Sequence, residues 1–214
     1  MIDYGHGVKL YPLDPANLEV YRQNRNDWRI RRWCRQRSLI DTYQQNDWFE
    51  NQYEDPRIEM LEIHHKGLVG VCGFTDIDYH NRRAEFSLYI NIDKQGQGYG
   101  AKGLETLVEW GFKDLNLNVI YGETIGRNPA EATFKKVGFV NTGYRSQFYW
   151  KDGEFHDSYI YCLDSDSYLS NLGKLDSDYS TSIKKITSTI TALPTKPIKG
   201  KNSTYTIRRV HYPR

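Results

Sequence analysis

The chain has 214 residues, of which 38% are hydrophobic and 14% aromatic, so that its length and composition predict one folded domain, or one domain with an appendage. A disordered chain would contain few aromatic residues, and the net charge of +2 is too small to indicate a partner. Three cysteines without the Cys/His spacing of a metal site indicate reduced thiols. With no secretory signal pattern and no apolar run of about 18 residues, we expect a soluble, cytoplasmic protein.

The first part of the chain predicts a strand followed by helices. Val8 to Leu13 alternates like a strand, and Asp14-Pro15 pairs an N-cap with a proline at the first helical position. A helix to about residue 25 and a second helical piece at 28–35 follow. Asp41 is expected to cap another helix, with Gln44 completing a capping box.

The middle of the chain predicts a hairpin and then a strand–helix–strand unit. Residues 59–64 and 68–75 form the expected hairpin, and residues 84–91 the next strand. After a glycine-rich loop, a helix from Ala101 to about Leu115 and a strand at 118–125 complete the unit. The apolar residues of this helix fall on one face and are Leu104, Leu107, Val108, Phe112 and Leu115.

The last elements before residue 165 are a helix and a hairpin. Asn128-Pro129 opens the helix and Gly138 is its natural end. Residues 144–150 and 154–163 form a hairpin that turns at Asp152-Gly153. The order of the elements indicates an α+β fold rather than a doubly wound sheet.

The composition changes near residue 165, which we take as the boundary between a folded domain (1–165) and a C-terminal extension (166–214). Residues 166–214 contain nine Lys and Arg against three Asp and Glu, and they are rich in Ser and Thr. The extension predicts one helix at about 177–193 and a short strand at 204–210. A basic, solvated extension is the expected form of this segment.

The loop at residues 95–100 places three glycines between a strand and an amphipathic helix. Glycines let the backbone turn tightly, and the N–H groups and positive dipole at a helix start favour a bound pyrophosphate. The spacing Gly-x-Gly-x-Gly from Gly96 fits neither the dinucleotide pattern nor the phosphate-loop pattern.

Three segments together resemble the GNAT superfamily of N-acetyltransferases. Gln95-x-x-Gly98-x-Gly100 matches the superfamily signature, and residues 128–139 resemble its Asn-led helix that ends in Lys-x-Gly-Phe. The segment 78–85 is similar to the subgroup that acts on ribosomal-protein N-termini, spermidine and nucleotide-linked amino sugars. The resemblance covers most of the chain before the extension. It implies a mixed, mostly antiparallel central sheet with splayed parallel strands and flanking helices.

The resemblance also implies acetyl-CoA as cofactor. The pantetheine arm would lie between the splayed strands 84–91 and 118–125, and the pyrophosphate on the glycine loop. Asn128 would contact the arm, with Phe134 and Lys135 near the adenosine end. The implied cofactor-binding residues are Leu88, Tyr89, Ile90, Gln95, Gly96, Gln97, Gly98, Tyr99, Gly100, Asn128, Phe134 and Lys135.

Acetyl transfer needs a base that keeps the amine neutral. Glu85 is the first candidate, because the family often places a carboxylate on that strand, and Glu123 is the second; either carboxylate could instead be a structural ion-pair partner. Many members carry a tyrosine as the acid for the leaving thiolate where this chain has Phe134. Tyr144 or Tyr149 would take its place, or the thiolate leaves unprotonated.

Seven arginines lie within 16 residues and indicate either a basic rim for an acidic acceptor or a solvated helix surface; they are Arg22, Arg25, Arg29, Arg31, Arg32, Arg35 and Arg37. The leading hypothesis is transfer of acetyl to a primary amine of a small, phosphate-bearing acceptor such as a nucleotide-linked amino sugar. The alternatives are a protein N-terminus, a nucleic-acid base (less favoured), or a CoA-binding regulator without turnover. We expect a monomer or homodimer and no membrane partner.

Overall fold

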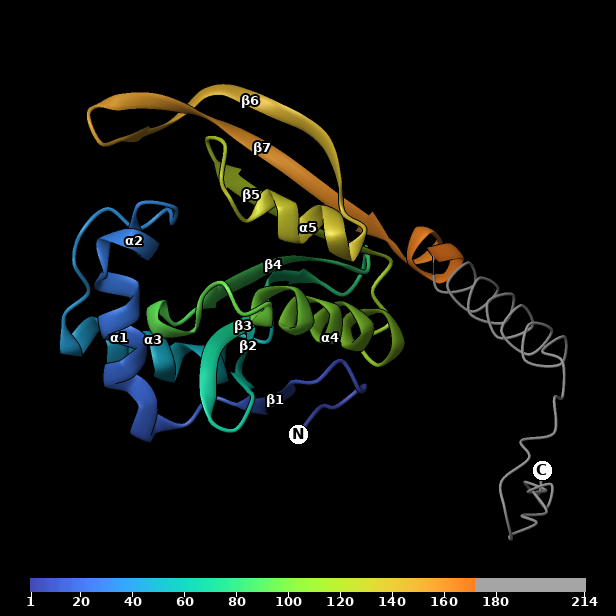
Figure 1. Cartoon of the computed structure of the whole chain (residues 1–214), viewed down its shortest axis with the longest axis horizontal. Helices are drawn as coiled ribbons and strands as arrows, with labels where there is room; N and C mark the ends of the chain where they lie inside the picture. The colour runs from blue at the N-terminus through green and yellow to red at the C-terminus, as the bar shows by residue number, and fades with distance from the viewer. Residues whose placement is uncertain (172–214) are drawn as a thin grey trace, which may run out of the picture. The chain divides into compact units, whose positions relative to one another are not determined.

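A seven-stranded sheet in the order β1-β2-β3-β4-β5-β7-β6 forms the centre of the protein (Figure 1). The computed structural model describes residues 1–171, so the helix expected at 177–193 and the strand at 204–210 lie outside the described residues. Only β4 and β5 pair in parallel among the described strands, which confirms the mixed, mostly antiparallel sheet. The strands are β1 (Lys9–Pro12), β2 (Glu59–His64), β3 (Leu68–Asp78), β4 (Arg83–Ile90), β5 (Val119–Ile125), β6 (Val140–Lys151) and β7 (Glu154–Asp164).

Helices cover both faces of this sheet, and alternation along the strands sends apolar residues to each face. Leu61 and Ile63 belong to the main core beneath α4 and α5, which lie side by side in Figure 1. Met60 and Val71 belong to a second cluster with residues of α1 and α3. The helices are η1 (Pro15–Asn17), α1 (Leu18–Asn26), α2 (Trp28–Arg31), α3 (Thr42–Glu54), η2 (Ile92–Lys94), α4 (Tyr99–Lys113) and α5 (Glu131–Val137).

The helix boundaries follow the predicted capping residues. The Asp14 side chain accepts a hydrogen bond from the Ala16 amide at 2.8 Å, and Asp41 and Gln44 form the expected capping box. Gly138 ends α5 with a φ of 108°. The first predicted helix is divided, because the turn at Pro15 is a 3-10 helix that passes into α1. The helix expected from Ala101 begins two residues earlier, directly after Gly98.

A buried carboxylate fixes the start of α1 against the sheet. Glu62 of β2 accepts hydrogen bonds from Asn17 Nδ2 at 2.6 Å and from the Tyr21 hydroxyl, and it hydrogen-bonds with His64 Nε2 at 2.5 Å. A buried charge is unfavourable unless it is well hydrogen-bonded. These bonds therefore hold α1, and through it α2, at a defined place over the second face of the sheet.

The folded unit continues past residue 165, where the composition changes. Residues 165–171 are helical, and the ring of Tyr168 is buried with its centroid 5.2 Å from that of Phe112. The compact unit accordingly includes all of the described residues, 1–171. Within residues 1–171, no helix combines the length and apolarity needed to cross a bilayer.

The parallel pair β4 and β5 stops pairing shortly after it begins. The paired residues end at Glu85 and Tyr121, although β4 continues to Ile90 and β5 to Ile125. The Phe86 ring lies against Gly122 at this point, where an added Cβ would come within 2.2 Å of Phe86 Cε1. The predicted divergence of the two strands therefore coincides with an aromatic ring that needs a residue without a side chain beside it.

We expect Gly122→Ala to destabilise the fold by about 1–3 kcal/mol, because a methyl group at this position overpacks the core around Phe86. Urea unfolding followed by tryptophan fluorescence measures the change. A second variant, Phe86→Leu, tests the cause: the double variant should lose less stability than the sum of the two single losses. Additive losses would contradict direct packing of the ring on Gly122.

Candidate active site

The loop before α4 has the backbone of an anion site. Gly96 and Gly98 have φ values of 75° and 80°, and an added Cβ would meet nothing within 4 Å at either. Glycine is therefore favoured at these positions by the positive φ of the backbone and not by a lack of room for a side chain. Among the described residues, no side chain caps α4, and its first turn holds no acidic residue. Its first amides and its dipole are thus directed at the exposed loop.

Two glutamines of the same loop hold its shape. Gln95 Nε2 donates to the Ile90 carbonyl at 3.1 Å, and Gln97 Nε2 donates to the Asp93 carbonyl at 3.4 Å. Both side chains bond back to the chain that leads into the loop. The glutamines thus stabilise the loop conformation, while the predicted diphosphate contact lies with backbone amides.

The unpaired edge of β4 offers main-chain groups to the gap between the splayed strands. The Asn91 amide donates to the Val69 carbonyl of β3 at 2.9 Å. The N–H and C=O groups of successive residues point alternately to the two neighbours of a strand. Leu88 and Ile90 therefore direct their amides away from β3, toward β5. Tyr89 directs its N–H and C=O groups to its partner Val71 on β3. Leu88 and Ile90 therefore provide the hydrogen-bonding edge expected for a pantetheine arm.

Asn128 caps the turn that leads into the Asn-led helix, two residues before Ala130, the N-cap of the regular helix α5. Asn128 Oδ1 accepts from the Ala130 amide at 2.9 Å, and the Asn128 amide donates to Glu131 Oε1 at 3.2 Å. The regular helix then starts at Glu131. Asn128 is half-buried beside the end of β5, so that capping and a cofactor contact are compatible roles.

Phe134 and Lys135, expected near the adenosine, differ in their surroundings. The Phe134 side chain is 6% exposed and packs edge-to-face on Phe86 and Tyr161, with ring centroids 4.9 and 5.6 Å away. Lys135 is exposed. The Phe134 ring is therefore part of the core, while Lys135 is available to a ligand.

The two candidate bases lie on the same face of the sheet. Ala84 and Phe86 belong to the main core, so alternation along β4 places Glu85 on the opposite face. Glu123 lies two residues after Tyr121, which is the partner of Glu85 in the register. The Glu85 and Glu123 side chains are only 15% and 8% exposed. The fold thus brings both carboxylates together at the point of strand divergence.

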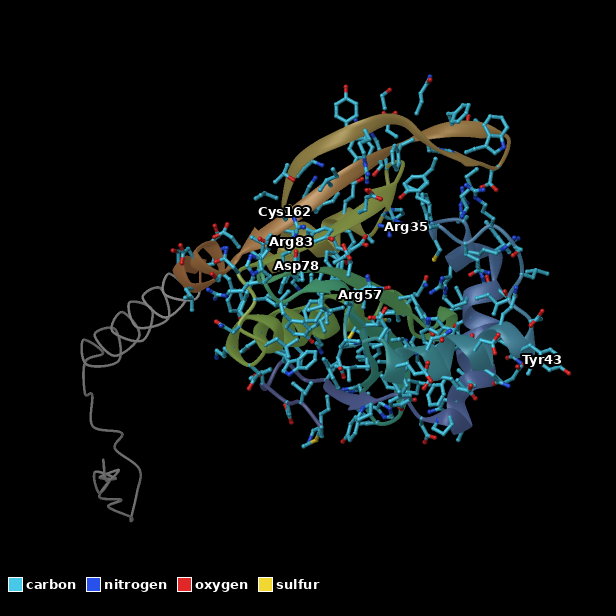
Figure 2. The ribbon with its side chains drawn as sticks, turned by 180° about the vertical axis from the view of Figure 1, so that it is seen from behind. Arg35, Tyr43, Arg57, Asp78, Arg83 and Cys162 are labelled. Carbon is cyan, nitrogen blue, oxygen red and sulfur yellow. The ribbon has the colours of Figure 1, made fainter. Side chains whose placement is uncertain are left out.

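Both carboxylates are paired with arginine. Arg35 Nη1 donates to Glu85 Oε2 at 3.0 Å, and Arg35 Nη2 lies 3.2 Å from Glu123 Oε2. Glu123 also pairs with Arg145 and accepts from the Tyr149 hydroxyl. Burial lowers the pKa of Arg35, but the hydrogen bonds and charge interactions with Glu85 and Tyr149 together outweigh it, so that the pKa lies above its ordinary value. Figure 2 shows Arg35 between the N-terminal helices and the β6–β7 hairpin.

The two tyrosines proposed as acids occupy different places on β6. Tyr144 is 63% exposed, with its ring centroid 6.0 Å from that of Tyr159, and it lines neither of the two cavities described below. Tyr149 lines both cavities. The register of β6 on β7 shifts between Arg145 and Tyr149, where Gln147 has a φ of 50°. This irregularity directs Arg145 and Tyr149 toward the same carboxylate.

A small cavity lined by two carboxylates and two arginines adjoins a larger, basic one. The first, of about 420 Å³, lies over the carboxylates and is lined by Arg35, Glu85, Tyr121, Gly122, Glu123, Arg145, Tyr149 and Ile160. Burial and the hydrogen bond to Asp76 raise the pKa of Tyr121 to about 12, which keeps this phenol protonated. The second, of about 710 Å³, is lined by Trp28, Arg31, Arg32, Cys34, Arg35, Gln36, Arg37, Ile125, Phe148, Tyr149, Trp150, Lys151 and Asp152.

Lys151 connects the two walls of the larger cavity. Its Nζ donates to the carbonyls of Arg31 at 2.8 Å and Gln36 at 3.2 Å, and also to that of Cys34. Burial lowers the pKa of this ammonium. Lys151 therefore anchors the segment after α2 to the end of β6, an arrangement that the sequence analysis did not predict.

Comparisons with known proteins identify the family and the fold. The family model for the acetyltransferase (GNAT) domain matches residues 8–140. The spermidine N(1)-acetyltransferase of Escherichia coli (strain K12) is 24% identical over 77% of this chain and 90% of its own length. A putative ribosomal N-acetyltransferase, YdaF of Bacillus subtilis (strain 168), is 28% identical over 72% and 87%. A crystal structure of spermidine N-acetyltransferase from Vibrio cholerae with CoA and spermine shares the fold, with a TM-score of 0.73 at 22% identity over 76% and 98%.

We expect Gly98→Ala to weaken CoA binding about tenfold, because a left-handed backbone costs an alanine about 1–2 kcal/mol and distorts the amides at the start of α4. Isothermal titration calorimetry with CoA measures the affinity. Gln97→Ala is the comparison variant: it removes one long hydrogen bond that supports the loop but leaves Gly98 free to keep its left-handed backbone, so it should weaken CoA binding less. Equal affinity in Gly98→Ala and the wild type would show that this loop does not hold the diphosphate.

Proposed function

The chain belongs to the acetyltransferase (GNAT) family, and from that premise we propose that it acetylates a primary amine on a small acceptor that carries an anionic group such as phosphate. Acetyl-CoA is the acetyl donor. The observation that carries the acceptor class is the cavity of about 710 Å³ beside the carboxylates, which four arginines and Lys151 line against one acid, Asp152.

The proposed cofactor site combines four features described above. The diphosphate lies on the amides of residues 96–100, and the pantetheine arm follows the edge of β4 at Leu88 and Ile90. Asn128 borders the arm, and Lys135 is the exposed cation near the adenosine end. The acetyl group then reaches the small cavity where β4 and β5 diverge.

Glu85 is the proposed base. An amine arrives mainly as its ammonium form, and Glu85 accepts the proton directly or through a water molecule. The amine nitrogen then attacks the thioester carbon, a carbon–nitrogen bond forms, and the carbonyl oxygen becomes negative. An amide on the edge of β4, such as that of Leu88, stabilises this oxygen. The carbonyl re-forms as the carbon–sulfur bond breaks and CoA leaves as a thiolate; the nitrogen releases its second proton, which balances the proton that the thiolate takes up.

Tyr149 is the better placed of the two tyrosines to protonate the thiolate. It lines both cavities and hydrogen-bonds to Glu123, whereas Tyr144 faces solvent. Glu123 keeps Tyr149 and Arg145 in position. In this arrangement Glu85 acts as the base and Glu123 as a positioning residue.

The charge around the acceptor cavity favours an anion over a polycation. Relatives are named as spermidine acetyltransferases, and spermidine carries several positive charges. Two unit charges 4 Å apart interact by about 4 kcal/mol at an effective dielectric constant of 20, so a polyamine would meet strong repulsion beside Arg31, Arg35 and Arg37. Trp28 and Trp150 also line the cavity and offer flat surfaces for a base or sugar. These features favour a nucleotide-linked amino sugar.

We expect Glu85→Gln to lower kcat about 10²–10⁴-fold, because the amide cannot accept the proton of the amine. CoA affinity should not change, since Glu85 lies outside the glycine loop. Steady-state kinetics following thiol release and calorimetry with CoA measure the two quantities. Glu123→Gln is the matched comparison and should cost less. A larger loss in Glu123→Gln would assign the base to Glu123.

An acceptor screen tests the substrate class directly. Amines with a phosphate group should show a kcat/KM at least about tenfold above that of spermidine, a difference of about 1.4 kcal/mol. Raising the salt concentration should narrow the difference, because salt screens exposed charges. A higher kcat/KM for spermidine at every salt concentration would overturn the proposal of an anionic acceptor.

Cellular location and oligomeric state stay predictions, namely a cytoplasmic monomer or homodimer. One Vibrio cholerae spermidine N-acetyltransferase has been solved as a dodecamer. Light scattering on this chain at several concentrations distinguishes these states.

A further inference from the structure

The proposed base is not free in this structure, because Arg35 occupies it. The guanidinium donates to both oxygens of Glu85 and also reaches Glu123. A carboxylate held by a guanidinium in this way has fewer acceptor positions left for an incoming ammonium. Acetyl transfer through Glu85 therefore requires Arg35 to move.

Arg35 is the member of the cluster that can move. Half of its side chain is exposed, whereas Glu85 and Glu123 lie on strands and are largely covered. Its main chain is fixed on both sides, because Lys151 Nζ binds the carbonyls of Cys34 and Gln36. Arg35 can accordingly leave Glu85 by rotation of its side chain, while the main chain of the segment after α2 stays where it is.

The two carboxylates would respond differently to this rotation. Glu123 would keep Arg145 and the Tyr149 hydroxyl. Glu85 would lose the one cationic side chain that pairs with it within residues 1–171. Removal of the Arg35 guanidinium therefore frees Glu85 selectively.

Arg35 also lines both cavities, and of the residues described only Tyr149 shares that position. Its guanidinium lies over the carboxylates, and it borders the larger basic cavity with Arg31, Arg32 and Arg37. An anion bound in the larger cavity would compete with Glu85 for the same guanidinium. Phosphate is a strong competitor, because its oxygens accept the paired N–H groups of arginine.

We propose that Arg35 is a displaceable counter-ion of Glu85 that determines specificity for the acceptor. The anionic group of the acceptor binds in the larger cavity and pairs with Arg35 in place of Glu85. Glu85 is then free to accept a proton from the amine of the same acceptor. This inference rests on the proposed function. Under this inference, the anionic group of the acceptor increases the rate of acetyl transfer as well as the affinity for the acceptor. Arg35 is a positioning residue, since it acts on the reaction through Glu85.

Inorganic phosphate provides a direct test. The acceptor in this test is a small amine that carries no anionic group. Added phosphate should raise the kcat of the wild type for this amine several-fold. Potassium chloride at the same ionic strength should not. Arg35→Gln should acetylate this amine without phosphate at or above the phosphate-activated rate of the wild type, and phosphate should no longer activate it.

Arg32→Gln is the matched control, because it removes one positive charge from the same cavity but no partner of Glu85. It should still be activated by phosphate, at a higher half-activating concentration. Arg35→Lys should retain part of the activation, and circular dichroism verifies the fold of each variant. Failure of phosphate to activate the wild type, or persistence of activation in Arg35→Gln, would overturn the inference while acetyl transfer itself stands. Absence of thiol release from the wild type with every amine would overturn the proposed function as well.

Discussion

The whole site depends on the end of pairing between β4 and β5 after Glu85 and Tyr121. If the parallel ladder continued, the amides of Leu88 and Ile90 would be satisfied within the sheet and would offer nothing to a ligand. Divergence leaves these groups open on one side, where they would give the cofactor arm of the proposed site a backbone edge to bind. The Phe86 ring against Gly122 provides a packing reason for this interruption, so that an unpaired strand edge is compatible with a well-filled core.

The same divergence gathers charge that the fold must neutralise. The side chains of Glu85 and Glu123 are largely covered, and covered polar groups need hydrogen-bond partners, which Arg35, Arg145 and Tyr149 supply. In the proposed mechanism, the pairing that stabilises these carboxylates also competes with the substrate amine for them. Stability and turnover therefore place opposite demands on Arg35, which is the exposed member of the group.

The sequence predicted those features whose cause is local. The glycine spacing at 95–100 encodes a backbone conformation, and the capping box at Asp41 encodes a helix start, so both were confirmed. Residue type and strand alternation identified Glu85 and Glu123 as candidates. The ion pair of Arg35 with Glu85 joins residues 50 positions apart in the sequence. Gln147 has a positive φ although it is not a glycine, so the sequence gives no sign of the irregularity in β6. Pattern alone therefore flagged a run of arginines but could not select Arg35, nor prefer Tyr149 to Tyr144.

Family membership and acceptor choice rest on different parts of the chain. The family model ends at residue 140, whereas Arg145, Tyr149 and Lys151 follow it on β6. The other wall of the acceptor cavity is the arginine-rich segment after α2, which lies far in sequence from the glycine loop. A shared fold positions the cofactor and the diverging strands, but function resides in the side chains placed on that fold. Relatives named for spermidine acetylation can thus share this fold with a chain whose proposed acceptor cavity is lined mainly by cations.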